Sequence, residues 1–210
     1  MCGITCLGDK VFVVRDSEPE IEVYDVSLSL KHRIKVAGLL NFNDVASCAK
    51  NNCLYICDYG GKRVYRVELN GNAINWKVKA QPQSLSVTPK SNIIVTMCDA
   101  STLNEFTPDG HLVREIDLHR SAIYPHHAVQ LTSGELLVSH RGTQHRVCRT
   151  DDDGIIVQYY GGQPGSGTGQ LYYPNHLFID KKGFILVVGS INNQVVLLNS
   201  SLTFVNKYIF

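Results

Sequence analysis

Short apolar stretches alternate with turn residues along the whole chain. The clearest case lies near the C-terminus, where the apolar residues 176–179 and 184–188 flank the turn sequence DKKG at 180–183. Apolar runs of this length that are bounded by Pro, Asp and Gly are typical of β-strands joined by tight turns, and they are too short for helices. The pattern therefore predicts a β-hairpin in this segment.

The same hairpin recurs through the chain. Its second strand reads, in chain order, KVFVV (10–14), CLYIC (53–57), NIIVT (92–96), ELLVS (135–139) and FILVV (184–188). A third and a fourth short apolar run follow each copy, separated by turn residues such as NG, PDG and DDDG. Four strands in a repeat of about 42 residues are typical of a β-propeller blade.

The sequence thus predicts an all-β fold, a β-propeller with five four-stranded blades. A β-sandwich also has many short strands, but it would not repeat one four-strand unit five times. We expect a single domain over residues 1–210, with blades at about 3–40, 41–81, 82–122, 123–171 and 172–210.

One family resemblance rests on residues 160–189, YGGQPGSGTGQLYYPNHLFIDKKGFILVVG. This segment resembles the hallmark of the NHL repeat, and Asp58 to Arg63 resembles in part the turn that follows it in that family. The last repeat departs from the pattern, with Gly189 and Gln194 in place of Asp and Arg. NHL propellers usually have six blades, so the resemblance implies a fragment or a variant of a six-bladed propeller. It also implies a recognition platform like the propellers of tripartite-motif, ubiquitin-ligase-like proteins.

Charge and composition exclude several classes of partner. The 210 residues carry 20 Lys and Arg against 19 Asp and Glu, a net charge of +1, so no strong overall field attracts nucleic acid or anionic lipid. No apolar stretch approaches the roughly 18 residues that span a bilayer, and the N-terminal MCGITCLGDKVFVV does not resemble a signal peptide. We expect a soluble, cytoplasmic protein without membrane contact.

The seven cysteines are an odd number, scattered through apolar runs. Reduced cysteines that act as small core residues explain them most simply. A zinc site from Cys48, Cys53 and Cys57 is the less favoured alternative, because their spacing lacks the paired ligands of zinc knuckles.

Two histidines are the sharpest candidates for chemistry. Ser84, His127 and His176 occupy equivalent positions, two residues after a proline, in strands that would line the channel of a propeller. His127 and His176 are therefore the candidate ligands of a metal-dependent lyase or hydrolase, although structural histidines are more common. The Gly-rich string at 165–169 precedes a strand rather than a helix, so it is neither a hydrolase elbow nor a phosphate cradle. We accordingly predict no catalytic residue, no metal, no cofactor and no enzymatic activity.

Basic and aromatic residues in the predicted loops are the candidate binding residues: Tyr59, Lys62, Arg120, Tyr124, His126, Arg141 and Tyr173. Tyr and Arg suit protein hot spots, and they also suit stacking on single-stranded RNA. Acidic residues interleave with the loop cations, so a protein partner is preferred and RNA is the alternative. If the ring of blades is open, unpaired blade faces also predict self-association.

Overall fold

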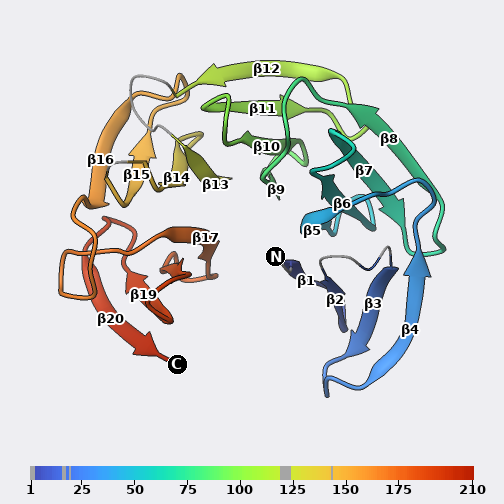
Figure 1. Cartoon of the computed structure of the whole chain (residues 1–210), viewed down its shortest axis with the longest axis horizontal. Coiled ribbons are helices and arrows are strands. Elements are labelled where there is room, and N and C mark those ends of the chain that lie inside the picture. Colours follow the sequence, from blue (N-terminus) through green and yellow to red (C-terminus); the bar gives the residue numbers. More distant parts are fainter. Residues whose placement is uncertain (1–2, 16–17, 19, 119–123, 143) are drawn as a thin grey trace. The chain divides into compact units, whose positions relative to one another are not determined.

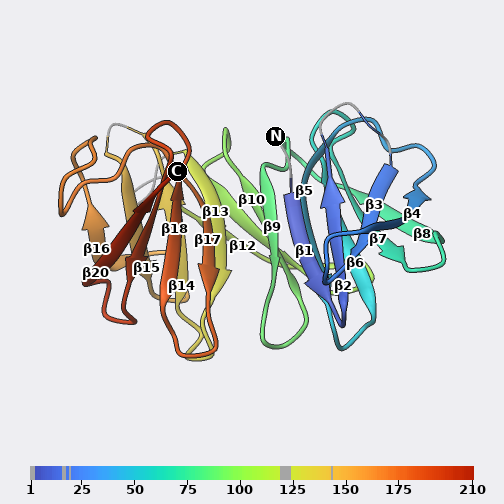
Figure 2. The ribbon, with the colours of Figure 1, turned by 90° about the horizontal axis from the view of Figure 1, so that it is seen from below.

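The computed structural model describes all of the chain except residues 1–2, 16–17, 19, 119–123 and 143. Its regular structure within the described residues consists of β-strands, which form five four-stranded antiparallel sheets (Figures 1 and 2). In each sheet the strands are neighbours in chain order, from β1-β2-β3-β4 to β17-β18-β19-β20. The predicted all-β propeller class with five four-stranded blades is confirmed.

The first three sheets contain strands β1 to β12. Their bounds are Gly3–Leu7, Lys10–Val14, Glu20–Asp25 and Leu30–Lys35 for β1 to β4; Phe42–Cys48, Cys53–Asp58, Arg63–Glu68 and Ala73–Lys77 for β5 to β8; and Ser84–Val87, Ile93–Met97, Thr102–Phe106 and Leu112–Asp117 for β9 to β12. The last two sheets contain β13 to β20. Their bounds are Pro125–Gln130, Leu136–His140, Arg146–Thr150 and Ile156–Gly161 for β13 to β16, and Pro174–Ile179, Ile185–Gly189, Gln194–Leu198 and Phe204–Ile209 for β17 to β20.

Contacts between residues divide the chain into two compact units. Unit 1 comprises Met1–Asp99 and Asn104–Arg114, and unit 2 comprises Ala100–Leu103 and Glu115–Phe210. The first two sheets belong to unit 1 and the last two belong to unit 2. The single domain expected from the sequence stays a prediction, and each unit is described by itself.

The core of unit 1 shows how sheets pack on one another. Phe12 and Val14 of β2 share a buried cluster with Leu54 and Ile56 of β6. Residues two apart in a strand lie on the same face of the sheet. Leu54 and Ile56 are not at the repeat positions of Phe12 and Val14, so the two sheets pack through different faces of the repeat. Burial of each such side chain stabilises the fold by about 1.5–3 kcal/mol.

Unit 2 repeats this arrangement. Leu137 of β14 and Val147 of β15 share a buried cluster with Ile185 and Val187 of β18. Leu137 occupies the repeat position of Phe12, and Val187 occupies that of Ile56. The alternation of apolar positions therefore sets which face of each sheet meets the next sheet.

The first strands of three sheets, β5, β13 and β17, begin earlier than the sequence pattern indicates. β17 begins at Pro174 rather than at His176, and its register with β18 shifts between Pro174 and Leu177. Pro has no N–H to donate, so it is tolerated at the first residue of a strand or beside a bulge. The following turn is as predicted, since Asp180 accepts the backbone N–H groups of Lys182 and Phe184, both at 2.8 Å.

The cysteines within the described residues are free thiols. Cys48 lies directly opposite Cys53 in the β5–β6 ladder, whereas Cys57 lies opposite Asp44 at the other end of the same ladder. The spacing along two strands therefore separates the three proposed zinc ligands. Among the described residues, no helix has the length and apolar character needed to cross a lipid bilayer.

Candidate functional site

The described candidate binding residues fall at the same loop end of several sheets. In unit 2, Tyr124 precedes β13, Arg141 follows β14 and Tyr173 precedes β17, while His126 lies inside β13. Tyr59 and Lys62 lie in the β6–β7 turn of unit 1. Arg120 lies outside the described residues. Unit 2 therefore holds the larger described group.

Three aromatic rings meet at this end of unit 2. His145, just before β15, stacks on Tyr172 with ring centroids 5.4 Å apart and an interplanar angle of 18°. Tyr173 meets His145 edge-on at 4.7 Å and meets Tyr172 at 5.3 Å. Offset-stacked and edge-to-face pairs at such distances are the favourable aromatic geometries. We call Tyr124, Arg141, His145, Tyr172 and Tyr173 the aromatic loop cluster.

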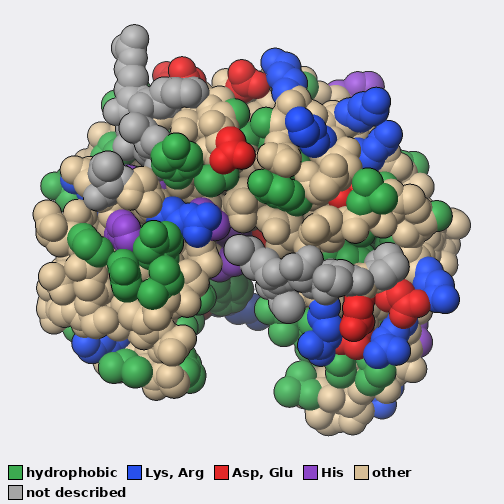
Figure 3. All heavy atoms as spheres, in the orientation of Figure 1, with side chains coloured by type: hydrophobic (Ala, Val, Ile, Leu, Met, Phe, Trp, Pro, Cys, Tyr) green, Lys and Arg blue, Asp and Glu red, His purple; other side chains and the backbone are tan. Residues whose placement is uncertain are grey.

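Two hydrogen bonds and a cation hold the cluster together. The backbone N–H of Tyr173 donates to Nδ1 of His145 at 2.9 Å, and the N–H of Arg141 donates to the carbonyl of Tyr124 at 3.3 Å. The Arg141 guanidinium lies 5.6 Å from the centroid of the Tyr173 ring, within the range of a cation–π contact. Figure 3 shows hydrophobic, basic and histidine side chains adjacent to one another over the last two sheets.

Backbone strain marks two members of the cluster. Tyr124 has a φ of 58° and Tyr173 a φ of 50°, in the left-handed region that bulky residues rarely adopt. Both residues precede the proline that begins an inner strand. Gly or Asn would adopt this conformation at lower cost, and Leu28 and Leu202 share it in other turns, so each of these positions carries a conformational cost.

His126 and His145 are neutral near pH 7. Burial is the main cause that lowers the pKa of His126 from 6.5 to about 4, and the charges of Arg141 and His176 contribute to the same shift. Burial also lowers the pKa of His145, again with a contribution from Arg141. The neutral His145 can therefore accept the Tyr173 N–H, and Arg141 is the cation of the cluster.

The two candidate metal ligands are close together in unit 2. The ring centroids of His127 and His176 are 4.6 Å apart, with an interplanar angle of 42°. His127 is buried, its Nδ1 accepts the N–H of Leu177 at 3.4 Å, and its backbone N–H donates to Ser139 at 3.1 Å. The sequence alignment of these two positions thus corresponds to a real proximity between β13 and β17.

The turn that carries Tyr59 and Lys62 is organised by Asp58. Its buried carboxylate accepts the backbone N–H groups of Asn41 and Gly61 at 3.0 Å and that of Leu40 at 3.3 Å. Three donors from two loops explain why an aspartate is needed at this position. In the last sheet the equivalent position is Gly189, and that turn forms without a carboxylate.

His145 was absent from the residues predicted to bind a partner. The residues around His145, just before the third strand of its sheet, form no recognisable sequence motif. Its role is shown only by its contacts with Tyr172 and Tyr173, which are distant in sequence. The available signal was the pair of adjacent tyrosines before Pro174. A cation above a second aromatic ring also went unpredicted, with the Arg146 guanidinium 4.1 Å from the centroid of Tyr159.

Comparison with known proteins identifies the fold and no family. No family model matches the chain, and no curated protein matches its sequence. Many solved structures are similar. The structure titled Nidogen/Laminin Complex matches with a TM-score of 0.78 and 14% identity, over 99% of this chain and 79% of that chain. A streptogramin B lyase matches with a TM-score of 0.76 and 16% identity, over 99% and 68% of the two chains.

A third match corrects one prediction. A gluconolactonase from Xanthomonas campestris has a TM-score of 0.76 and 16% identity, over 99% of this chain and 74% of that chain. The prediction that the chain is not an enzyme is wrong as an inference from its architecture, because this fold is shared with a lyase and a lactonase. Identities this low establish a common fold, and a propeller fold hosts both catalysis and binding.

Proposed function

We propose that the chain is an NHL-type propeller that recognises a protein partner through the aromatic loop cluster of unit 2. The observation that supports this proposal most directly is the strained Tyr173, whose ring contacts His145, Tyr172 and Arg141. Tyr and Arg dominate protein hot spots because they combine large contact area with directional polar groups.

The cluster is already organised for binding. Its rings are fixed by one another and by the bond from Tyr173 to His145, so little side-chain entropy remains to be lost on association. His145 is buried, Tyr172 and Tyr173 are half-buried, and Tyr124 is exposed. Among the described residues no carboxylate forms an ion pair with Arg141. A carboxylate of the partner would therefore complete the guanidinium's bidentate bonding.

Single-stranded RNA is the weaker alternative for the same cluster. Its rings could stack on bases, but among the described residues of unit 2 the cations that lie over aromatic rings are Arg141, above Tyr173 of the cluster, and Arg146, above Tyr159 outside it. Each neutralised phosphate contributes a log–log salt slope of about −0.7, so two contacts give a weak and shallow dependence on salt. A protein hot spot needs only two or three such anchors.

Photo-cross-linking tests this function. We would place a benzophenone amino acid at Tyr172 and expose the chain to cell extract with unlabelled competitor chains. We expect one principal protein adduct that wild-type competitor removes and that Tyr173→Gly competitor does not. Lys181→Ala, on an exposed turn of the same unit, is the control and should compete as wild type does. An adduct sensitive to ribonuclease, or equal competition by Tyr173→Gly, would refute the proposal.

A second candidate is a metal-dependent lyase or hydrolase. The proximity of His127 and His176 favours it, and a streptogramin B lyase among the similar structures has the same fold. Because His127 Nδ1 accepts the Leu177 N–H, its Nε2 would be the ligand atom. Elemental analysis of protein purified without chelator decides the matter. Stoichiometric metal that is lost in His127→Gln, His176→Gln protein supports this candidate, and metal-free wild type rejects it.

We also propose a cytoplasmic location. The six described cysteines are free, five of them buried among core residues, which fits a reducing compartment.

A further inference from the structure

One face of the last sheet is apolar and exposed. The register aligns Phe178 with Leu186, Leu186 with Leu197, Val188 with Val195, and Val195 with Tyr208. Directly opposed residues in an antiparallel ladder project to the same side. We call the six apolar residues of this side the open face of the last sheet: Phe178, Leu186, Val188, Val195, Leu197 and Tyr208. The polar residue Asn206, opposite Leu197, lies on the same side.

Exposure distinguishes the two sides of this sheet. Phe178 is 63% exposed, Val188 39% and Tyr208 47%, whereas Val187 and Val196 on the other side are at most 2% exposed. A hollow of about 350 Å³ adjoins the open face and is lined in part by Val188, Val195 and Phe210. A contiguous apolar patch of this kind marks an interaction surface.

The preceding sheet shows what this kind of face does. Leu137 and Ser139 of β14 hold the repeat positions of Leu186 and Val188, and both are fully buried. Leu137 belongs to the core cluster that β18 and β19 complete. The same face is therefore used for sheet-on-sheet packing inside unit 2, which indicates that the open face fits another apolar sheet face.

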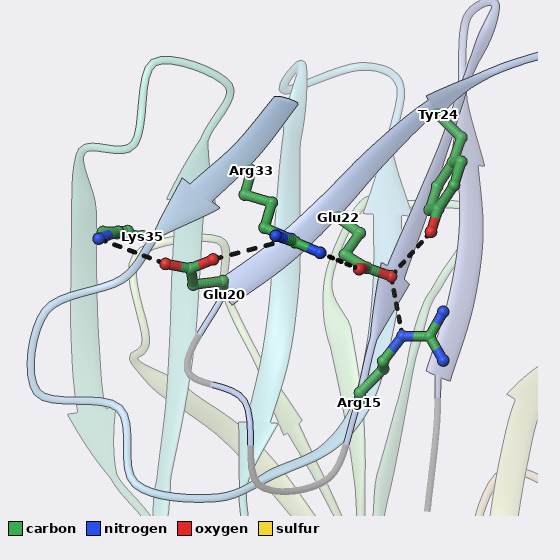
Figure 4. A network of polar contacts seen from close by, with 6 residues as sticks. All are labelled: Arg15, Glu20, Glu22, Tyr24, Arg33 and Lys35. Carbon is green, nitrogen blue, oxygen red and sulfur yellow. Dashed lines mark hydrogen bonds and ion pairs between the residues drawn. The ribbon is translucent and has the colours of Figure 1, made fainter. Parts of the chain in front are cut away.

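The first sheet is unsuited to meet the open face. Val13 of the first sheet and Val187 of the last sheet hold the same repeat position. Val187 lies opposite Val196, whereas Val13 lies opposite Glu22, so the first sheet carries a carboxylate where the last sheet carries valine. Figure 4 shows that Arg15 and Arg33 contact Glu22, at 2.8 and 2.9 Å, and that the network extends to two further charged residues, Glu20 and Lys35. To cover these charges with an apolar face would remove them from water without new partners, at a large cost.

We propose that the open face binds the open face of a second copy of this chain, in a two-fold symmetric dimer. The six residues of the open face carry no charge, so their mutual burial desolvates no ion. The charged first sheet excludes the head-to-tail alternative, in which the last sheet of one copy meets the first sheet of the next. A two-fold contact is self-complementary and closes at two subunits.

The size of the face sets the strength of the dimer. Four strands about 4.8 Å apart, with about five residues at 3.3 Å each, give a projected area of roughly 300 Å². Side chains that project from the sheet add to this area, but the total remains below the roughly 800 Å² of surface that each partner buries in a standard stable interface. The dimer is therefore expected to be weak and to form as the protein concentration rises.

Sedimentation velocity over about 1–200 µM protein tests the proposal, together with a variant that places two like charges on the face, Phe178→Glu with Tyr208→Glu. We expect the wild-type mass to rise to that of a dimer and to stop there, and the variant to dissociate at least ten-fold more readily. Both substituted side chains are substantially exposed, so folding should be unaffected, as circular dichroism and the melting temperature would verify. The matched control is Val113→Glu, which charges an exposed strand position of β12.

Three outcomes would overturn the proposal. They are wild type that remains monomeric at 200 µM, growth beyond the dimer, and a double-glutamate variant that associates as wild type does. A benzophenone amino acid at Phe178 gives an independent readout. We expect intermolecular cross-links to residues 174–209, and cross-links to residues 3–35 would show the head-to-tail contact instead.

Discussion

His145 accepts the backbone N–H of Tyr173 through its Nδ1 at 2.9 Å, across 28 positions of sequence. The bond joins the start of β15 to the start of β17, and so couples the loops of two successive sheets in unit 2. Since His145 is buried and its pKa is lowered, the bond persists at neutral pH. This acceptor fixes the position of Tyr173 within the aromatic loop cluster.

Loss of that acceptor should be costly. We expect His145→Phe to lower the free energy of unfolding by about 1–3 kcal/mol, because the Tyr173 N–H loses its partner while the ring volume is retained. Urea denaturation measures the change. His145→Gln, which keeps a hydrogen-bond acceptor, should recover part of the loss, and equal loss in both variants would contradict the assigned role of Nδ1.

Tyr173 should separate stability from binding. Tyr173→Gly removes the ring contacts but relieves the positive φ, worth about 1 kcal/mol, so its melting temperature should lie closer to wild type than that of Tyr173→Ala. Both variants should lose the partner in the cross-linking assay. A Tyr173→Gly chain that is less stable than Tyr173→Ala would show that the backbone is not strained there.

His126 should make unit 2 less stable in mild acid. Its folded pKa of about 4 lies below the ordinary 6.5, so the unfolded chain binds the proton more readily. The contribution of the neutral ring is fully present above about pH 6.5 and is lost as the pH falls toward 4. Melting temperatures from pH 4 to 7 should fall less steeply in His126→Gln. Proton NMR of the wild type should show no titration of this ring above pH 5.

Glu22 should affect the stability of the protein at a lower pH than His126 does. Hydrogen bonds from Arg15 and Arg33 lower its pKa from 4.5 to about 2, so the stabilisation is present above about pH 4.5 and is lost as the pH falls toward 2. Glu22→Gln should reduce stability at pH 7 by about 1 kcal/mol and flatten the pH profile in this window. Differential scanning fluorimetry from pH 2 to 7 measures both effects. An unchanged profile would mean that the network is too well solvated to contribute.

Asp58 should be the most sensitive position of the β6–β7 turn. Asp58→Ala leaves three backbone N–H groups of two loops without their acceptor, so we expect a loss of about 2–4 kcal/mol. Chemical denaturation gives the magnitude. Within the described part of the chain, the Asp180 carboxylate accepts N–H groups of its own exposed turn only. Asp180→Ala should therefore lower the free energy of unfolding clearly less than Asp58→Ala does.

Local rules account for the part of the structure that the sequence determined. The period of two in strands such as 184–188, and the turn residues between them, follow from interactions of each residue with its near neighbours. Five copies of that pattern therefore predicted five four-stranded sheets. The partial match at Asp58 to Arg63 likewise identified a turn whose carboxylate accepts three N–H groups.

Only the tertiary structure showed which side chains meet and which faces remain exposed. The contact between His145 and Tyr173 depends on how one sheet packs on the next. The first sheet carries Glu22 at the position where the last sheet carries Val196, and this difference also depends on what each sheet packs against. The alternation of apolar residues is the same in a covered sheet and in an exposed one. Leu137 and Leu186 are thus equivalent in the sequence pattern, yet the first is buried by the following sheet and the second lies on the open face, because burial is a property of the neighbour and not of the strand.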